Sequence, residues 1–350
     1  MDKVSDPARF NFQTLQCGRA LAALAVVLFH ANGTLALPKY FGIQPAHVFS
    51  SGFSGIYYFF VLSGAVMVLA HWRQIGQRQS PRNFFIKRFV RIYLPLWAVL
   101  AIIVPLLAGR AGLGDILLAF SALPAGQENI LAIEWTLRHE ILFYALFGVL
   151  LWRPRLGMAL LGLWLAASGL TALWNIPFPI DFLLSNLHLL FGAGMLGAVA
   201  IVKGWGPPRP IAAAGAILFA LAWLSQVLSI QSLETMSVWL YGAGALLLIV
   251  GFAQMEVHQG LTTPKFLQQM GDASYSLYLV HFPVISLCAK LFFWLNGRAG
   301  GLPLIFYFVM TVGIAVACGF AFHKCIEAPL LRLGKQTFAR RASHPVKAMD

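Results

Sequence analysis

Charged side chains are scarce in this chain. Asp, Glu, Lys and Arg make up 11% of its 350 residues, whereas hydrophobic types make up 59%, and the mean hydropathy is +0.76. In a typical soluble domain about a quarter of the residues are charged. The composition therefore excludes a soluble domain with a single anchor and predicts a protein that crosses a membrane many times.

Signatures of soluble catalytic modules are also missing. There is no G-x-x-x-x-G-K-[ST] phosphate loop, so ATP-driven transport is not expected. There is no G-x-S-x-G turn of the hydrolase type either. The four cysteines fall in or next to hydrophobic segments and lack the spacing of metal ligands. We therefore expect no disulfide framework and no metal cofactor.

The hydrophobic segments predict an all-α polytopic membrane protein with about ten transmembrane helices. They cover 14–37, 52–71, 89–109, 132–152, 156–174, 181–202, 210–229, 235–254, 273–295 and 302–325. The segment 112–123 is shorter and contains Asp115, which is typical of an interfacial or re-entrant segment. No internal repeat is evident. We expect a single transmembrane domain over 1–333, followed by a basic, mobile cytoplasmic tail over 334–350.

The net charge of +13 is unevenly distributed among the connecting segments. If the N-terminus is cytoplasmic, the opposite side receives only Lys39, Arg110 and Arg298 among the loop and tail cations. Cytoplasmic loops carry the excess of Lys and Arg, so both termini are expected in the cytoplasm. The excess charge then orients the protein and contacts anionic lipid head groups, and no nucleic-acid partner is expected.

Arg19 and His30 lie on the first predicted span, with only Ala, Leu, Val and Phe between them. Eleven positions correspond to almost three helical turns, so the two side chains share a face about 16 Å apart along the axis. Ionisable groups at such depth are costly and indicate function. The alternative is that Arg19 marks the membrane surface and His30 makes one interhelical hydrogen bond.

Two arginines precede the third span at helical spacing. Arg88 and Arg91 are three residues apart and therefore neighbours on one helix face. Paired guanidinium groups at the inner surface suit a polyphosphate, because each can bind phosphate oxygens bidentately. Lipid head-group anchoring is an equally good interpretation of this feature alone.

Polar residues crowd the start of the fourth span. Arg138 follows Glu134 by four residues, in the favourable order for an ion pair, and Glu140 and Tyr144 share a face. Two carboxylates and His139 within seven residues indicate a cavity rather than a solvated helix end.

Further polar positions occur elsewhere in the spans. His281 lies within the ninth span and is either a structural hydrogen-bonding group or a ligand. Glu327 ends the last span, where a pairing with a loop arginine is expected. Ser63 and Gly64 lie mid-span, where small residues favour close helix packing.

Taken in order, these motifs resemble the membrane-bound acyltransferase-3 family over about residues 11–333. They are Arg19 with His30, Phe59-Phe-Val-Leu-Ser-Gly64, Lys87-Arg88 to Pro95, Trp135-Thr-Leu with Glu140 and Phe143-Tyr144, Ser274-Tyr-Ser-Leu-Tyr-Leu-Val-His281, and Glu327-x-Pro329. The fourth of these is similar to exopolysaccharide O-acetyltransferases. Other members carry a fused SGNH domain that this sequence does not show, so the membrane domain is expected to act alone or with a separate partner.

The resemblance implies transfer of an acyl group, first of all acetyl, from cytoplasmic acetyl-CoA or another acyl-CoA to a sugar hydroxyl. The expected acceptor is a cell-surface saccharide or lipid-linked oligosaccharide, reached from the bacterial inner membrane, with membrane lipids and polysaccharide-assembly proteins as further partners. In the family the arginine and histidine of the first span are the essential pair, a role that carries to Arg19 and His30. Arg88 and Arg91 match the donor site, and Arg19 is expected with them on the cytoplasmic side, where the phosphates of CoA would bind.

Physical chemistry is compatible with these roles. His30 can remove the hydroxyl proton as the oxygen attacks the thioester, and Glu140 is expected to orient the imidazole. Glu134, Tyr144 and His281 are candidate substrate contacts. The competing hypothesis is a flippase or proton-coupled carrier that uses the same His and Glu, although the repeat symmetry common in such proteins is absent. A third hypothesis is that the protein is an inactive partner in polysaccharide assembly.

Overall fold

A computed structural model describes residues 10–77, 80–107, 111–124, 130–171, 176–230, 236–297 and 301–343, together with Pro7, Gly109 and Trp174. Arg110, Arg298 and the end of the tail from 344 lie outside the described residues. The described part of the chain consists of helices and loops, and it contains no strand. This confirms the predicted all-α class.

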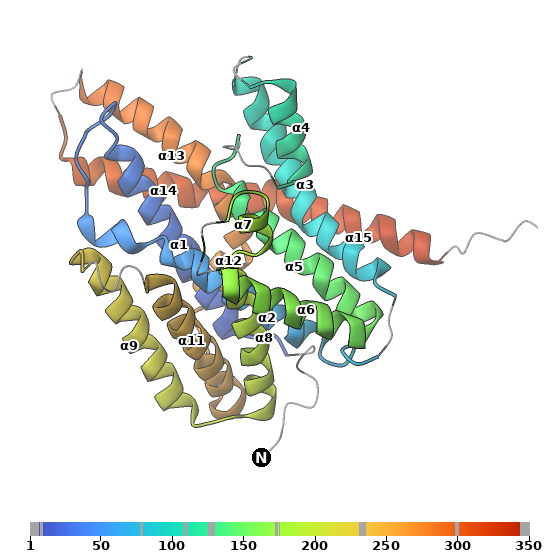
Figure 1. Ribbon diagram of the computed structural model, residues 1–350. Coiled ribbons are helices and arrows are strands. Elements are labelled where there is room, and N and C mark those ends of the chain that lie inside the picture. The colour runs from blue at the N-terminus through green and yellow to red at the C-terminus, as the bar shows by residue number, and fades with distance from the viewer. Residues whose placement is uncertain are drawn as a thin grey trace, which may run out of the picture.

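The helices follow one another through short loops (Figure 1). They are α1 (Gln13–Leu35), α2 (Ser54–His71), α3 (Arg82–Leu106), α4 (Leu113–Ser121), α5 (Glu134–Trp152), α6 (Pro154–Thr171), α7 (Ile180–Leu183), α8 (His188–Lys203), α9 (Pro208–Val227), α11 (Ser237–Gln259), α12 (Lys265–Asp272), α13 (Ser274–Asn296), α14 (Leu304–Phe322) and α15 (Ala328–Ser343).

All ten predicted hydrophobic segments contain a helix, but eight described segments are long and apolar enough to cross a membrane. The two that fall short are α5 and α6. The polar first turns of α5, with Glu134, Arg138 and Glu140, lower its hydropathy, and α6 opens with Pro154 and Arg155. Of these three charged residues of α5, Glu140 lines the cavity described below.

Glycines bring α2 and α8 into close contact. A Cβ on Gly64 of α2 would collide with the backbone oxygen of Phe191, and a Cβ on Gly194 of α8 would collide with that of Val61. The packing role predicted for Gly64 is therefore confirmed. Because the next residue towards the N-terminus, Ser63, lines a cavity instead, the same turn of α2 serves both packing and the site.

The start of α1 is fixed by a carboxylate from a distant helix. The Glu256 side chain of α11 accepts hydrogen bonds from the backbone N–H groups of Gln13 and Thr14, at 2.7 and 2.8 Å, and from the Thr14 hydroxyl at 2.5 Å. The first N–H groups of a helix have no partners within it, and a negative charge there also suits the helix dipole. Glu256 thereby positions α1, on which Arg19 and His30 lie.

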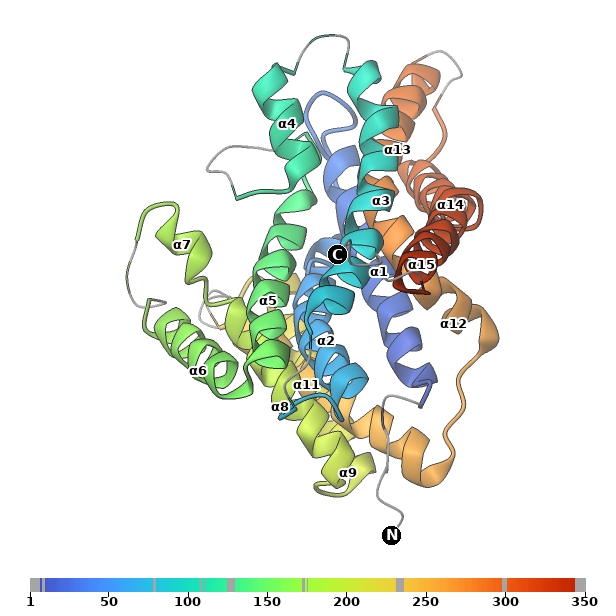
Figure 2. The same ribbon diagram turned by 90° about the vertical axis from the view of Figure 1, so that its right-hand side faces the viewer.

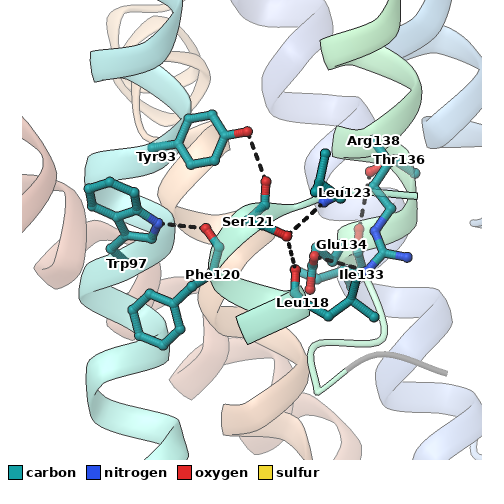
Figure 3. Close-up of polar contacts among 10 residues, drawn as sticks. All are labelled: Tyr93, Trp97, Leu118, Phe120, Ser121, Leu123, Ile133, Glu134, Thr136 and Arg138. Carbon is teal, nitrogen blue, oxygen red and sulfur yellow. Dashed lines mark hydrogen bonds and ion pairs between the residues drawn. The ribbon is translucent and has the colours of Figure 1, made fainter. Parts of the chain in front are cut away.

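The short segment predicted to be interfacial or re-entrant forms α4, which packs along α3 (Figures 2 and 3). Tyr93 Oη and Trp97 Nε1 of α3 donate to the carbonyls of Ser121 and Phe120, at 3.0 and 2.8 Å. These carbonyls belong to the last turn of α4, where intrahelical donors run out. The chain then returns through Ile133 to the start of α5.

The last span continues through a π-helical turn, His323–Glu327, into α15, which projects from the bundle in Figure 1. The predicted pairing of Glu327 with a loop arginine is wrong. Its Oε2 accepts from Ser276 Oγ at 2.5 Å and lies 2.8 Å from His323 Nδ1. Helix α15 covers the predicted tail as far as Ser343, and the mobility of the tail stays a prediction.

Candidate active site

A cavity lies among α1, α2, α3, α5, α8 and α13, and its volume is about 910 Å³ with its open mouth included. Apolar and aromatic side chains form most of its lining. The charged groups in the lining are Arg19, Arg88, Arg91 and Glu140. Three of the four residues predicted for catalysis or donor binding on α1 and α3 thus meet in one space, and the cavity carries more positive than negative charge.

The three arginines are held by aromatic rings and one serine. Arg19 Nε donates to Ser274 Oγ at 3.1 Å. The Arg88 guanidinium lies over the Tyr144 ring at 5.2 Å from its centroid, and that of Arg91 lies over Tyr275 at 5.9 Å. Ring faces orient a guanidinium without neutralising it. The charges of these arginines therefore stay available to a ligand.

Arg88 carries a direct sign of an incomplete polar site. Its Nε is buried and has no hydrogen-bond partner among the described residues. A buried donor without a partner costs free energy, so such groups call for an explanation. An anionic ligand in the cavity would supply the missing acceptor.

Glu140 is held between two hydroxyl groups. Ser63 Oγ donates to Glu140 Oε1 at 3.2 Å, and Tyr144 Oη donates to the same oxygen. The expected position of Glu140 beside the imidazole of His30 is not what the structure has. Glu140 instead links α2 to Tyr144, whose ring supports Arg88.

At another part of the cavity lining, Tyr278 of α13 is tied to α5. Its hydroxyl lies 2.7 Å from Thr136 Oγ1 and donates to the carbonyl of Ile133 at 3.1 Å. The cavity is lined by Tyr278 and not by His281, which follows it by one turn on α13. The rings of Tyr278 and His281 are 5.7 Å apart, so the tyrosine links the cavity to the histidine behind it.

His30 and His281 form a pair across α1 and α13. His281 Nε2 lies 3.2 Å from His30 Nδ1, and the ring centroids are 5.0 Å apart. His30 does not line the cavity in the described part of the chain. Its immediate neighbours include Phe29 and Phe282, whose rings meet the imidazole edge to face. The partner that sequence reasoning assigned to His30 was Glu140; in the structure it is His281.

The remaining polar residues of α5 point elsewhere. Glu134 and Arg138 form the predicted ion pair, at 3.2 Å, with both side chains buried (Figure 3). Neither lines the cavity, so Glu134 stabilises the start of α5 in this structure rather than facing the cavity. His139 lies 2.8 Å from His188 of α8, in a separate buried pair.

Two groups of the site were not singled out from the sequence. Ser274 was not identified as the partner of Arg19, and Thr136 was not identified as the partner of Tyr278. The signal for the first was available: Ser274, Tyr275 and Tyr278 open the ninth span at positions that share a helix face. The contact itself could not be predicted from the sequence, because Arg19 and Ser274 are 255 positions apart and lie on different helices.

These features define a class of protein: an all-α, multi-pass membrane protein with a cationic cavity between its helices. The chain belongs to the acyltransferase-3 family, because the family model described as an acyltransferase domain matches residues 12–322. It is thus a membrane acyltransferase by family.

Two relatives agree with this assignment. The chain is 31% identical over 323 residues to the exopolysaccharide production protein ExoZ of Rhizobium meliloti, covering 86% of this chain and 95% of that protein. It is 28% identical over 366 residues to the acyltransferase MdmB of Streptomyces mycarofaciens, covering 90% of each. No solved structure gives a significant match.

Proposed function

We propose that this protein is an O-acyltransferase of the bacterial inner membrane. It moves an acyl group, with acetyl as the proposed group, from cytoplasmic acyl-CoA to a saccharide hydroxyl. The observation that carries the proposal is the grouping of Arg19, Arg88 and Arg91 in one cavity of a family acyltransferase. A polyphosphate is the ligand that this grouping suits, and in a family acyltransferase it would be part of an activated acyl donor.

The donor's phosphates would bind at the arginines. Each guanidinium can hold phosphate oxygens through paired N–H groups, and the buried Nε of Arg88 would gain an acceptor. Arg19 lies two turns into α1, and Arg88 and Arg91 lie two to three turns into α3. Alternate spans start from the same side of a membrane, so these arginines share one membrane face, which the distribution of Lys and Arg assigns to the cytoplasm.

The acyl group would then react near His30, which lies outside the cavity lining, so the proposal requires the donor's acyl arm to extend beyond this lining. On α1 this residue lies about 16 Å beyond Arg19 along the helix axis. His30 takes the proton of the acceptor hydroxyl while the hydroxyl oxygen attacks the thioester carbonyl carbon. The carbon–sulfur bond breaks, the new ester forms, and the thiolate leaves with the proton that His30 returns to it.

A saccharide is the acceptor class that we propose. The name of ExoZ connects that relative with exopolysaccharide production, and a sugar offers hydroxyl groups for ester formation. A lipid-linked oligosaccharide would bring such hydroxyls to the membrane surface, and proteins of polysaccharide assembly would deliver or receive it. The acyl transfer itself needs only the donor, the acceptor and the His30 base.

Two measurements test the proposal together. Purified protein is supplied with acetyl-CoA and with polysaccharide from cells that lack the protein. The release of free CoA thiol and the mass of the polysaccharide are then measured. We expect thiol release that depends on the polysaccharide and a mass gain of one acetyl group per event. Saccharide movement across vesicles without thiol release would contradict the proposal and favour a flippase.

A further inference from the structure

The hydrogen bonds of His281 fix which of its nitrogens carries the proton. Its Nδ1 lies 2.7 Å from the carbonyl oxygen of Tyr278 and 3.1 Å from that of Leu277. A carbonyl oxygen can only accept a hydrogen bond, so Nδ1 must be the donor. In the neutral ring, Nε2 then has a free lone pair, and this lone pair faces His30.

The same reasoning applies to His30. Its Nδ1 lies 3.0 Å from the carbonyl oxygen of Val26 and 3.2 Å from His281 Nε2. Both neighbours are acceptors, so the Nδ1–H of His30 is shared between them. The proton-free nitrogen of His30 is therefore Nε2, which takes part in none of the hydrogen bonds found among the described residues.

We propose that His281 is a positioning residue for the acyl transfer. It keeps His30 in the tautomer whose Nε2 can accept a proton, and it accepts the Nδ1–H hydrogen bond that strengthens when His30 becomes positive. This inference rests on the proposed function, in which His30 takes the proton of the acceptor hydroxyl and returns it to the departing thiolate.

The surroundings explain why a second acceptor is useful. The His30 ring meets Phe29 and Phe282, which offer no polar atom to an imidazolium. A positive charge in apolar surroundings is costly unless hydrogen bonds compensate it. Val26 supplies one carbonyl from the same helix, and His281 supplies the only acceptor from another helix among the described contacts of His30. The His281 ring is fully buried and its Nδ1 is bonded to the Tyr278 carbonyl, so its Nε2 is held towards His30.

Two conservative variants of His281 separate its local role from its role at His30. His281→Asn can keep the hydrogen bond to the Tyr278 carbonyl, but its amide is too short to reach His30. His281→Gln is long enough to place its amide oxygen near His30 Nδ1. We expect His281→Asn to lower kcat about 10- to 100-fold, as is usual when a supporting hydrogen bond to a working histidine is lost. The kcat of His281→Gln should stay within about fivefold of the parental value, because this variant keeps a hydrogen bond to His30. The KM for acetyl-CoA should be unchanged in both.

A matched control is the second histidine pair. His188 is as buried as His281 and contacts His139 at 2.8 Å, outside the cavity. His188→Asn is expected to lower thermal stability in detergent while kcat of the folded fraction stays at the parental value. This separates loss of a buried histidine contact in general from loss of the contact to His30.

The outcomes distinguish the inference from the function on which it rests. Equal kcat values for His281→Asn and His281→Gln, or a parental kcat for His281→Asn, would overturn the inference. The proposed function would stand in that case if His30→Gln has lost transfer. Parental transfer by His30→Gln would contradict the proposed base and the role of His281 with it.

Discussion

Three arginines and one carboxylate share the cavity lining, and this imbalance sets what the site can bind. Opposite charges within the site would cancel, but the partners of Arg88 and Arg91 are ring faces rather than carboxylates. An anion that enters is therefore not competing with an internal ion pair. At this scale, donor affinity should depend on the arginines and turnover on the groups that orient them.

The first prediction concerns Arg88 and Arg91. Arg88→Ala or Arg91→Ala should raise the Kd and KM for acyl-CoA about tenfold or more, because each removes a charge-assisted hydrogen bond worth about 1.5–3 kcal/mol. The KM for the acceptor should change much less. Equilibrium binding of CoA to the purified variants is the measurement.

Arg153→Ala is the matched control for the arginines. Arg153 follows α5, is exposed and lies outside the cavity lining, over the ring of Trp152. It should bind CoA like the parent. Parental CoA binding by Arg88→Ala and Arg91→Ala as well would mean that these residues are lipid anchors.

The second prediction concerns Glu140. Glu140→Gln keeps an oxygen for Ser63 and Tyr144 but removes the negative charge from the cavity. CoA binding should be maintained or tightened because the cavity becomes more positive. The kcat should fall about tenfold, because the two hydrogen bonds that hold Tyr144 and Ser63 would then be made to a neutral acceptor and be about half as strong. Unchanged kcat in folded protein would remove Glu140 from the mechanism.

The sequence could predict which side chains of a single helix lie on the same face, because helical spacing alone decides it. Arg88 with Arg91, and Glu140 with Tyr144, are cases where the spacing was sufficient. Contacts between helices were beyond it. The pairing of His30 with His281 depends on the crossing of α1 and α13, whose residues are 251 positions apart. From the sequence, Glu140 was predicted to be the residue that contacts the His30 imidazole.

At the scale of elements, the site depends on how closely α2 approaches α8. Gly64 and Gly194 each lie against a backbone carbonyl of the opposite helix, so α2 can present Ser63 towards Glu140 only if this crossing stays tight. The crossing is a packing feature rather than a chemical one. Substitution of Gly64 or Gly194 should therefore lower stability more than it lowers catalysis.

The third prediction follows from this crossing. Gly64→Ala and Gly194→Ala should each destabilise the protein by about 1–3 kcal/mol, the usual cost of overpacking. Gly162→Ala is the control, because a Cβ there meets nothing within 4 Å on α6. Thermal unfolding of the purified proteins in detergent gives the comparison. Equal melting temperatures for all three variants would show that the crossing tolerates the extra methyl group.

At the scale of the whole molecule, the two ends of the proposed reaction face different compartments. The proposed donor, acyl-CoA, is cytoplasmic, so the proposal predicts that the arginines lie on the cytoplasmic side. The composition was enough to predict the fold class and the helices. It was not enough to show which partners stabilise the polar turns of α5, such as Ser63 for Glu140, because these partners lie on other helices.

The fourth prediction tests the orientation. In a background without native cysteines, Gln77→Cys lies in the loop before α3, and Lys39→Cys lies after α1; both positions are exposed. A membrane-impermeant maleimide should label Lys39→Cys in intact cells and Gln77→Cys only after permeabilisation. The reverse pattern would place the arginine cavity on the wrong side for cytoplasmic acyl-CoA.

Acyl transfer and CoA binding by purified His30→Gln protein test the central claim most directly. Glutamine can keep one hydrogen bond at this position but cannot take a proton at neutral pH. His71→Gln is the control, because His71 Nδ1 also bonds to the carbonyl four residues earlier, at 3.0 Å, but its ring meets Phe84 and Phe147 and not a second histidine.

We predict that His30→Gln binds acetyl-CoA like the parent, since the three arginines are intact, and loses transfer by about 10²–10⁴-fold. His71→Gln should transfer at close to the parental rate. Near-normal transfer by His30→Gln would show that His30 is a packing residue and would contradict the mechanism.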